Sequence, residues 1–281
     1  GYMTDLQHAT VDDVKEFFRL YYAPNNATLA IAGDFDAVKA KAWVAKYFTD
    51  LKRGAPIVRP AVPATTMSTV KRVTYEDRVQ VPRLYLSWPT VGEDSPDDKV
   101  LDLVTAILTG PRTARLTKAL VYDQQSAAQV QAFQATSENY GAYGIQVTPR
   151  PGHTLTELEA SVDSVLERFK REGPTAEEMM KATAGNEFSF VSGLESNLNK
   201  AELLLRGAAF HNDVGYYKKL YASIKAVTAA DVKRVTNKYL TPGRVVLSVV
   251  PMGKAGDASQ AAASKKITVA ADGGHYIVEG K

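Results

Sequence analysis

The chain has 281 residues, enough for one large domain or two ordinary ones, and 45% hydrophobic with 23% charged residues is typical of a folded protein. Its 34 basic and 31 acidic residues leave a net charge of +3 and are well mixed, which argues against a nucleic-acid-binding surface. The absence of cysteine excludes disulfides, thiolate nucleophiles and cysteine-ligated zinc, and no apolar run approaches the length of a membrane span.

A stretch near the start of the chain recurs near its end. Residues 10–33 align with residues 228–251 after a shift of 218 positions. The identical pairs are Thr10/Thr228, Asp13/Asp231, Val14/Val232, Lys15/Lys233, Tyr21/Tyr239, Pro24/Pro242 and Leu29/Leu247. In so short a window about one or two identities are expected by chance, so the match indicates an internal repeat.

Each copy predicts a helix followed by a strand. A threonine can cap the helix, and an aspartate three residues later completes a capping box. Apolar residues then follow at helical spacing, which in the first copy are Val14, Phe17, Phe18 and Tyr21. A proline ends each helix, and strands are expected at 28–32 and 245–250. The repeat therefore predicts the end of one domain, then a whole domain that closes in the same way.

The segments between the copies predict further elements in chain order. Asp36 caps a helix to about Phe48, and the stretch rich in Pro, Ala and Thr at 54–69 is typical of an extended linker. Strands follow at 71–76, 83–88, 128–136 and 143–148, the last two as an antiparallel pair. Helices are expected from Pro96, around Leu116–Val121, after Thr154, from Thr175 in pieces to Arg206, and at 216–224, and short strands at 266–270 and 275–278.

This order predicts an α+β fold, an antiparallel sheet with helices packed on one face, preceded by a helix–strand–helix remnant of another domain. We divide the chain into that remnant at 1–53, a linker at 54–70, the α+β domain at 71–254 and a tail or second linker at 255–281. The first residue is glycine and the first helix begins within ten residues, so we expect a piece of a longer chain.

Neither a catalytic nor a metal-binding constellation is predicted in this chain. The histidines, His8, His153, His211 and His275, are too far apart to share one helical face as zinc ligands. The sequence also lacks a Gly-x-Ser-x-Gly elbow, a Ser-x-x-Lys motif and a glycine-rich phosphate loop. We therefore expect neither catalytic residues nor a cofactor in this chain.

Several segments, taken in order, resemble the insulinase/pitrilysin family of zinc metallopeptidases, which includes the mitochondrial processing peptidases. They are TVDDVKEFFRLYYAPNNATLAIAGDFD, DRVQVPRLYLSWPT, SPDDKVLDLVTAILTG, RTARLTKALVYDQQ, PRPGHTLTELEASVDSVLERF and TPGRVVLSVVP. The likeness extends to about Lys254. It implies two or four similar α+β domains joined as a clamshell around a chamber. It also implies that zinc binds to an inverted His-x-x-Glu-His helix upstream of the segments seen here.

The same resemblance indicates where substrate contacts are expected. The arginine and tyrosine that hold substrate in the non-zinc half of the family align with Val121 and Ala128, which cannot donate those hydrogen bonds. The loop 109–113 aligns with a glycine-rich substrate loop, so Gly110, Pro111 and Arg112 are predicted to face substrate. The strand at 128–136 is a candidate for strand addition by an extended peptide, or else a solvated polar surface.

The resulting prediction is a non-catalytic, substrate-enclosing wall domain of a zinc metalloendopeptidase, inactive alone. The alternatives are a peptidase-derived scaffold without proteolytic chemistry and an unrelated α+β binding module. Expected partners are a peptide or unfolded polypeptide, a zinc-bearing domain, a second homologous half, and another copy through the apolar face of the first helix. The resemblance favours a periplasmic over a cytoplasmic location, because large bacterial relatives are often exported to the periplasm, although cytosolic relatives exist as well. A chain without cysteine is compatible with that compartment.

Overall fold

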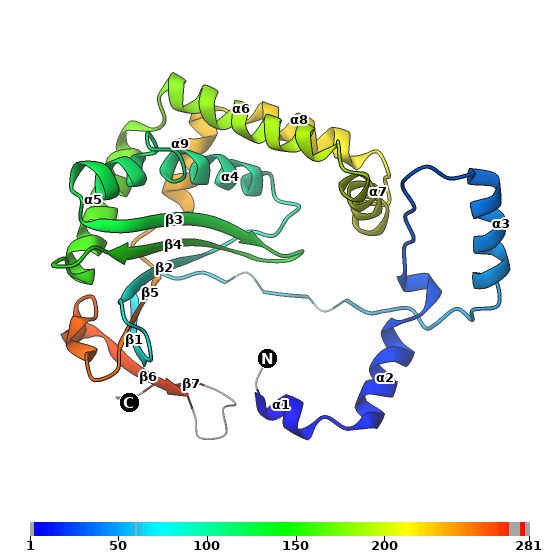
Figure 1. Cartoon of the computed structure of the whole chain (residues 1–281), viewed down its shortest axis with the longest axis horizontal. Helices are drawn as coiled ribbons and strands as arrows, with labels where there is room; N and C mark the ends of the chain where they lie inside the picture. Colours follow the sequence, from blue (N-terminus) through cyan, green and yellow to red (C-terminus); the bar gives the residue numbers. More distant parts are fainter. Residues whose placement is uncertain (1–2, 60, 64, 270–275, 279–281) are drawn as a thin grey trace. The chain divides into compact units, whose positions relative to one another are not determined.

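The computed structural model describes residues 3–59, 61–63, 65–269 and 276–278 (Figure 1). The chain divides into two compact units. The first unit comprises residues 1–61 and 185–225, and the second comprises residues 62–184 and 226–281.

The described part of the second unit is built on a seven-stranded sheet in the order β3-β4-β2-β5-β1-β6-β7. Its strands are β1 (Lys71–Asp77), β2 (Arg83–Thr90), β3 (Ala127–Thr136), β4 (Gly141–Pro149), β5 (Val245–Pro251), β6 (Lys265–Val269) and β7 (Tyr276–Val278). The predicted β3–β4 pair is confirmed as antiparallel. β1, however, runs parallel to both β5 and β6, so the sheet is mixed and not wholly antiparallel. β5 lies between β1 and β2 in the sheet. It runs antiparallel to β2 and parallel to β1.

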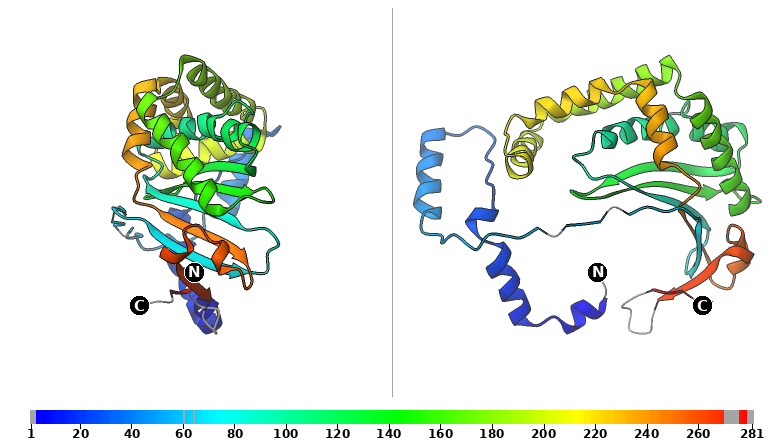
Figure 2. Two further views of the ribbon diagram at one scale, coloured as in Figure 1. Left: turned by 90° about the vertical axis from the view of Figure 1, so that its left-hand side faces the viewer. Right: turned by 180° about the vertical axis from the view of Figure 1, so that it is seen from behind.

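Three helices cover one face of this sheet (Figures 1 and 2). They are α4 (Pro96–Leu108), α5 (Leu155–Glu172) and α9 (Ala229–Tyr239). α9 packs against α4, α5 and β2, and α4 also packs against β3. Alternate residues of β2, namely Leu84, Leu86 and Trp88, enter the core beneath them. The predicted α+β class, with helices on one face, is confirmed.

The helix starts follow the local sequence signals. Ser95 caps α4 ahead of Pro96 in the first turn, and Thr154 caps α5. The repeated threonine–aspartate pairs both form complete capping boxes, Thr10 with Asp13 and Thr228 with Asp231. The sequence repeat is therefore also a repeat of local structure.

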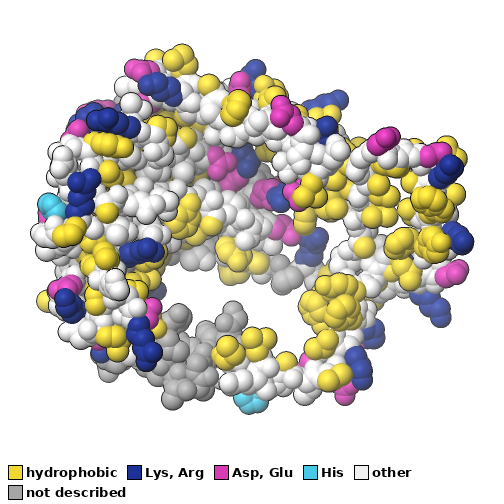
Figure 3. All heavy atoms as spheres, in the orientation of Figure 1, with side chains coloured by type: hydrophobic (Ala, Val, Ile, Leu, Met, Phe, Trp, Pro, Cys, Tyr) yellow, Lys and Arg dark blue, Asp and Glu magenta, His cyan; other side chains and the backbone are white. Residues whose placement is uncertain are grey.

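The first unit is helical and has almost no core of its own. It contains α1 (Met3–His8), α2 (Val11–Tyr21), α3 (Ala37–Phe48), α7 (Asn197–His211), α8 (Tyr216–Ala226) and the second half of α6 (Ala176–Gly193). Within its described residues, Ala23 and Ile224 are the buried hydrophobic side chains. The same unit carries 23 of the 31 exposed large hydrophobic side chains of the described chain, many of them on α2 and α3 (Figure 3).

The strand expected at 28–32 is absent, and this part of the prediction is wrong. In the second copy the equivalent strand β5 has β1 and β2 as neighbours. Residues 28–32 pair with no other strand in the described chain, and an isolated strand leaves its backbone groups without partners. The apolar faces of the two repeated helices also differ in burial. On α2, Phe17 is 52% exposed and Phe18 50%, whereas Val232 and Val235 on α9 are fully buried.

The tail after β5 is attached to the sheet. Ser259 is buried, and its N–H donates to Ser248 Oγ at 3.0 Å, while the hydroxyls of Thr74 and Ser264 lie 2.6 Å apart. The two short strands predicted here are confirmed as β6 and β7. Of the predicted positions, 270 and His275 lie outside the described residues. The domain boundaries given above stay predictions.

The two capping boxes provide a matched pair of substitutions. Thr228→Ala is expected to lower the stability of the second unit by about 1 kcal/mol, because the helix it caps is packed into the core. Thr10→Ala removes the same hydrogen bond from a helix without buried residues and should leave that stability unchanged. Urea unfolding followed by Trp88, the buried tryptophan of β2, measures both; equal losses would contradict this account.

Candidate functional site

The face of the sheet opposite the helices remains open to solvent. Strand residues alternate, so that Tyr85 and Ser87 of β2 and Leu247 of β5 lie on this face and are half-buried. The register places Gln131, Gln146, Tyr85 and Leu247 in one row across four strands, and Phe133, Gly144, Ser87 and Val245 in the next. The phenyl ring of Phe133 lies directly against Gly144, where an added Cβ would be 2.2 Å from the ring. The open face is thus apolar in part, with amide and hydroxyl groups between.

A pocket of about 610 Å³ opens at one end of this face. It is lined by Thr65, Met67, Ser87, Pro89, Thr90, Val91, Gly92, Asp94, Ser95, Glu138, Asn139, Tyr140, Gly141, Ala142 and Val245. The linker contributes Met67, whose carbonyl oxygen lies so close to Gly243 that an added Cβ would be 2.0 Å away. A concave site with mostly apolar walls and a few polar groups is typical of ligand binding.

One wall of the pocket is held by contact between two turns. The Glu93 N–H of the β2–α4 loop donates to the Ser137 carbonyl of the β3–β4 turn at 3.1 Å. A Cβ on Gly141 would lie 2.3 Å from the Val91 carbonyl oxygen, so glycine is required at this close approach. The sequence prediction missed this pocket, although the small residues Ser87 and Ala142 on facing strands were a usable signal.

The predicted substrate-facing residues lie elsewhere. Gly110, Pro111 and Arg112 form an exposed loop after α4, and none of the three lines the pocket. Gly110 has a φ of 109°, and the Arg112 guanidinium lies 4.5 Å from the centre of the Tyr122 ring. The preceding residue, Thr109, accepts a hydrogen bond from the Ala132 N–H of β3 at 3.0 Å. The structure therefore joins the predicted loop to the predicted strand, and the substrate role of the loop stays a prediction.

Val121 and Ala128, the two positions that align with the family's substrate-holding arginine and tyrosine, lie at or beside β3. Val121 belongs to a π-helical turn, Thr117–Asp123, and is half-buried against the core, whereas Ala128 is exposed at the start of β3. The region predicted to be helical is therefore confirmed, with π geometry.

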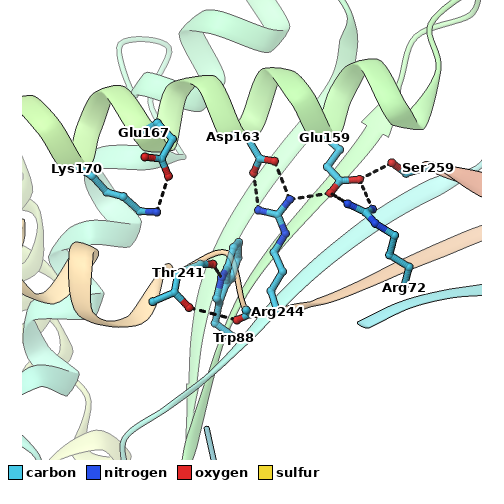
Figure 4. A network of polar contacts seen from close by, with 10 residues as sticks. Arg72, Trp88, Glu159, Asp163, Glu167, Lys170, Thr241, Arg244 and Ser259 are labelled. Carbon is cyan, nitrogen blue, oxygen red and sulfur yellow. Dashed lines mark hydrogen bonds and ion pairs between the residues drawn. The ribbon is translucent and has the colours of Figure 1, made fainter. Parts of the chain in front are cut away.

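A buried charge network holds α5 on the sheet (Figure 4). Glu159 accepts two hydrogen bonds from Arg72 of β1, at 2.7 and 2.8 Å, and one from Arg244 beside β5 at 2.7 Å. Ser259 of the tail donates to the same carboxylate, and Arg244 also pairs with Asp163. Burial opposes ionisation of Glu159, but the hydrogen bonds from Arg72, Ser259 and Arg244 outweigh it and lower its pKa. Both oxygens of the Glu159 carboxylate are hydrogen-bonded, whereas Arg244 Nε is buried without a hydrogen-bond partner among the described residues. We interpret the network as structural.

Metal-ligating side chains are dispersed in the described chain. The described residues hold no group of three His, Asp or Glu side chains placed to bind a metal ion. His153 pairs with Glu157 at 2.9 Å, and the ring of His211 stacks on Tyr216. His275 lies outside the described residues. In the parts of the chain that the structure covers, no helix is long and apolar enough to cross a membrane.

Several known proteins are similar to this chain in sequence and in fold. The sequence profile described as "Peptidase M16 inactive domain" matches residues 8–186. The zinc protease PqqE of Helicobacter pylori is 25% identical over 252 residues, which cover 85% of this chain and 54% of that protein. The crystal structure of a protease from Helicobacter pylori superimposes with a TM-score of 0.79 at 23% identity, covering 89% of this chain and 61% of that one.

A crystal structure described as the peptidase M16 inactive domain from Pseudomonas fluorescens gives a TM-score of 0.75 at 21% identity, over 89% of this chain and 59% of that one. The chain thus spans about half the length of the curated zinc protease it matches. Because the family profile covers more than half of the residues, the chain belongs to the family of peptidase M16 inactive domains.

Proposed function

We propose that this chain is the non-catalytic, substrate-enclosing part of a zinc metalloendopeptidase. The observation that carries the proposal is the one-sided sheet: its helices leave the other face open, with half-buried apolar and amide side chains and a pocket at one end. Such a face suits an extended or unfolded polypeptide, which offers both apolar side chains and backbone hydrogen-bonding groups. Catalysis then belongs to a zinc-bearing domain outside this chain.

The partner that supplies zinc is proposed to cover the first unit. Among its described residues the first unit has two buried hydrophobic side chains, and Phe17, Phe18 and Trp43 are exposed, so its own packing cannot stabilise it. The repeat indicates what should cover α2, because in the second copy the equivalent face of α9 is covered by α4, α5 and β2. We propose that a homologous helix-and-sheet layer of the zinc-bearing domain takes this place, and that self-association through α2 occurs when that domain is absent.

The test uses the chain alone and offers it an unfolded polypeptide as substrate. We expect no turnover of reduced, carboxymethylated α-lactalbumin with or without added zinc, and no zinc retained after dialysis. Hydrogen exchange should show protection by the polypeptide at the two loops that contribute to the pocket, 91–94 and 138–140, and none on the helices α4 and α9. Tight zinc binding or turnover would overturn the non-catalytic role, and unchanged exchange in both loops would overturn the enclosing role.

A second candidate is a peptidase-derived scaffold without proteolytic chemistry. It is favoured by fold similarity to a chain in a structure titled "Complex III2 from Candida albicans, Inz-5 bound", with a TM-score of 0.74 at 14% identity over 93% of this chain. At that identity the similarity concerns the fold alone. The two functions differ in whether the partner domain carries an intact His-x-x-Glu-His zinc motif.

We also propose a periplasmic location. Support comes from the absence of cysteine and from fold similarity to the periplasmic protease PqqL of Escherichia coli, with a TM-score of 0.62 at 15% identity.

A further inference from the structure

Three basic side chains lie on the open face of the sheet. They are Lys71 of β1, Arg83 of β2 and Lys265 of β6. The residues of β5 that pair with Lys71 and Arg83 alternate with buried core residues of that strand, so both cations lie on the open face. Lys265 pairs with Val73, two residues from Lys71, and so shares that face. All three are exposed, and we refer to them as the open-face cations.

These cations differ in their pairing from the basic residues on the opposite side of the same strands. There Arg72 forms an ion pair with Glu159 at 2.7 Å, and Lys266 forms one with Glu76 at 2.8 Å. The open-face cations form neither an ion pair nor a side-chain hydrogen bond with any part of the chain that the structure describes. These strands therefore satisfy their positive charges on one face and leave them available on the other.

Hydrophobic side chains fill two rows between Lys265 and Arg83. The register places Lys265, Val73, Leu247 and Tyr85 in one row across β6, β1, β5 and β2, and Ile267, Tyr75, Val249 and Arg83 in the next. The six hydrophobic members are all half-buried. Four strands span about 14 Å, because neighbouring strands lie about 4.8 Å apart. Lys265 and Arg83 thus stand at opposite ends of an apolar strip, with Lys71 in the preceding row.

Acidic side chains of this face lie outside the strip. Among the described strand residues, Asp77 is the acidic one that shares the open-face phase, and it pairs with Pro251 one row beyond Arg83. Two further acidic residues, Asp94 and Glu138, line the pocket at the other end of the face. The strip itself is therefore apolar and positively charged, and a ligand that matches it carries negative charges on an apolar body.

We propose that this strip selects segments of extended polypeptide in which two acidic residues, four positions apart, flank an apolar one. The inference rests on the proposed function, because it names the kind of polypeptide that the open face encloses. An extended chain rises about 3.3 Å per residue, so residues four positions apart project to the same side about 13 Å from each other. At that spacing the two carboxylates reach Lys265 and Arg83, and the residue midway contacts the hydrophobic rows. A nucleic acid has the charge but offers no aliphatic side chains to these rows.

The test measures fluorescence polarisation of labelled twelve-residue peptides mixed with the full chain. One peptide carries Glu-x-Val-x-Glu in a sequence rich in Ser and Thr; its first twin has Gln in place of both Glu, and its second twin has the two Glu side by side. At low salt we expect the spaced acidic peptide to bind about tenfold more tightly than the Gln twin, the effect of two exposed ion pairs, and also more tightly than the second twin. The difference should vanish in about 0.5 M NaCl.

The peptide series on the wild type needs no variant to fold. Equal affinity of the spaced peptide and either twin would overturn the selectivity while leaving the enclosing role intact, whereas no binding by any of the peptides would overturn both. Tighter binding of dodecathymidylate than of the spaced acidic peptide would overturn the choice of a polypeptide.

Substitutions then locate the site. Arg83→Gln combined with Lys265→Gln should abolish the preference for the spaced acidic peptide and leave binding of the Gln twin unchanged. Arg168→Gln combined with Arg171→Gln is the matched control, because it removes the same charge from exposed positions of α5 on the helix side, and it should keep the preference. An equal loss in both pairs would assign the effect to the net charge of the chain and overturn the proposal.

Discussion

Replacing Glu159 with glutamine is expected to destabilise the second unit by about 3–5 kcal/mol, the usual loss when one partner of a buried ion pair is removed. Glu159 is 2% exposed and accepts hydrogen bonds from Arg72, Arg244 and Ser259. An amide would turn its NH₂ group toward a guanidinium donor and leave the half-buried positive charge of Arg72 without a carboxylate. Urea unfolding followed by fluorescence measures the loss.

Two features of the chain make this measurement specific. The chain has two tryptophans, the exposed Trp43 of the first unit and the buried Trp88 of the second, so a Trp43→Phe background reports on the second unit. Glu167→Gln is the matched control, because Glu167 lies on the same helix and pairs with Lys170 at the surface (Figure 4). Its expected effect is below about 0.5 kcal/mol. Similar losses for both variants would show that the network adds no stability of its own.

Asp97→Asn is expected to cost about 1–2 kcal/mol at pH 7 and nothing at low pH. Burial at the start of α4 opposes ionisation, but hydrogen bonds from Arg234, Lys238 and Tyr239 outweigh it and lower the pKa of Asp97 to about 2. A carboxyl whose folded pKa is below its unfolded value of about 3.9 stabilises the protein above that value. The wild-type advantage should therefore shrink as the pH falls from 4 to 2, in unfolding curves measured at low salt.

Asp102, one and a half turns further along α4, provides a control of opposite sign. Its side chain is 43% exposed, yet partial desolvation raises its pKa to about 6; Lys99 opposes the rise, while the charge of Asp98 adds to it. The folded protein thus holds a proton there that the unfolded chain has lost, and stability falls as the pH rises from about 4 through 6. Asp102→Asn should be neutral below pH 4 and slightly stabilising at pH 7. A pH-independent effect of either variant would contradict these assignments.

Local signals in the sequence predicted most of the second unit. Both capping boxes formed because a threonine and an aspartate three residues later satisfy the first backbone donors wherever a helix can start. The strand predicted at 28–32 is absent, although its sequence resembles that of β5. Strand formation depends on neighbours, and β5 has β1 and β2 beside it. The order of strands was also beyond local reasoning, since β1 and β5 meet only through the tertiary fold.

The candidate site was less predictable than the fold. The loop at 109–113 and the strand β3 were both singled out by the sequence, but the hydrogen bond that joins Thr109 to Ala132 links residues 23 positions apart. The pocket on the open face depends on the linker residue Met67 packing against Gly243, a contact that no periodicity indicates. Glu159 was also missed, because a charged residue beside Leu158 on an amphipathic helix is usually at the surface.

The position of β1 inside the sheet limits when the second unit can complete its fold. Lys71 pairs with Val245, 174 positions later, and Val73 pairs with Lys265. Contacts between such distant residues close large loops and slow folding. During synthesis, the hairpin of β3 and β4 can form early, whereas β1 has no partner strand beside it until β5 has emerged. Throughout that interval Arg72 also lacks two members of its hydrogen-bonded network, because Arg244 and Ser259 both come after β4 in the sequence. A chain arrested before β5 would therefore expose both edges of β1.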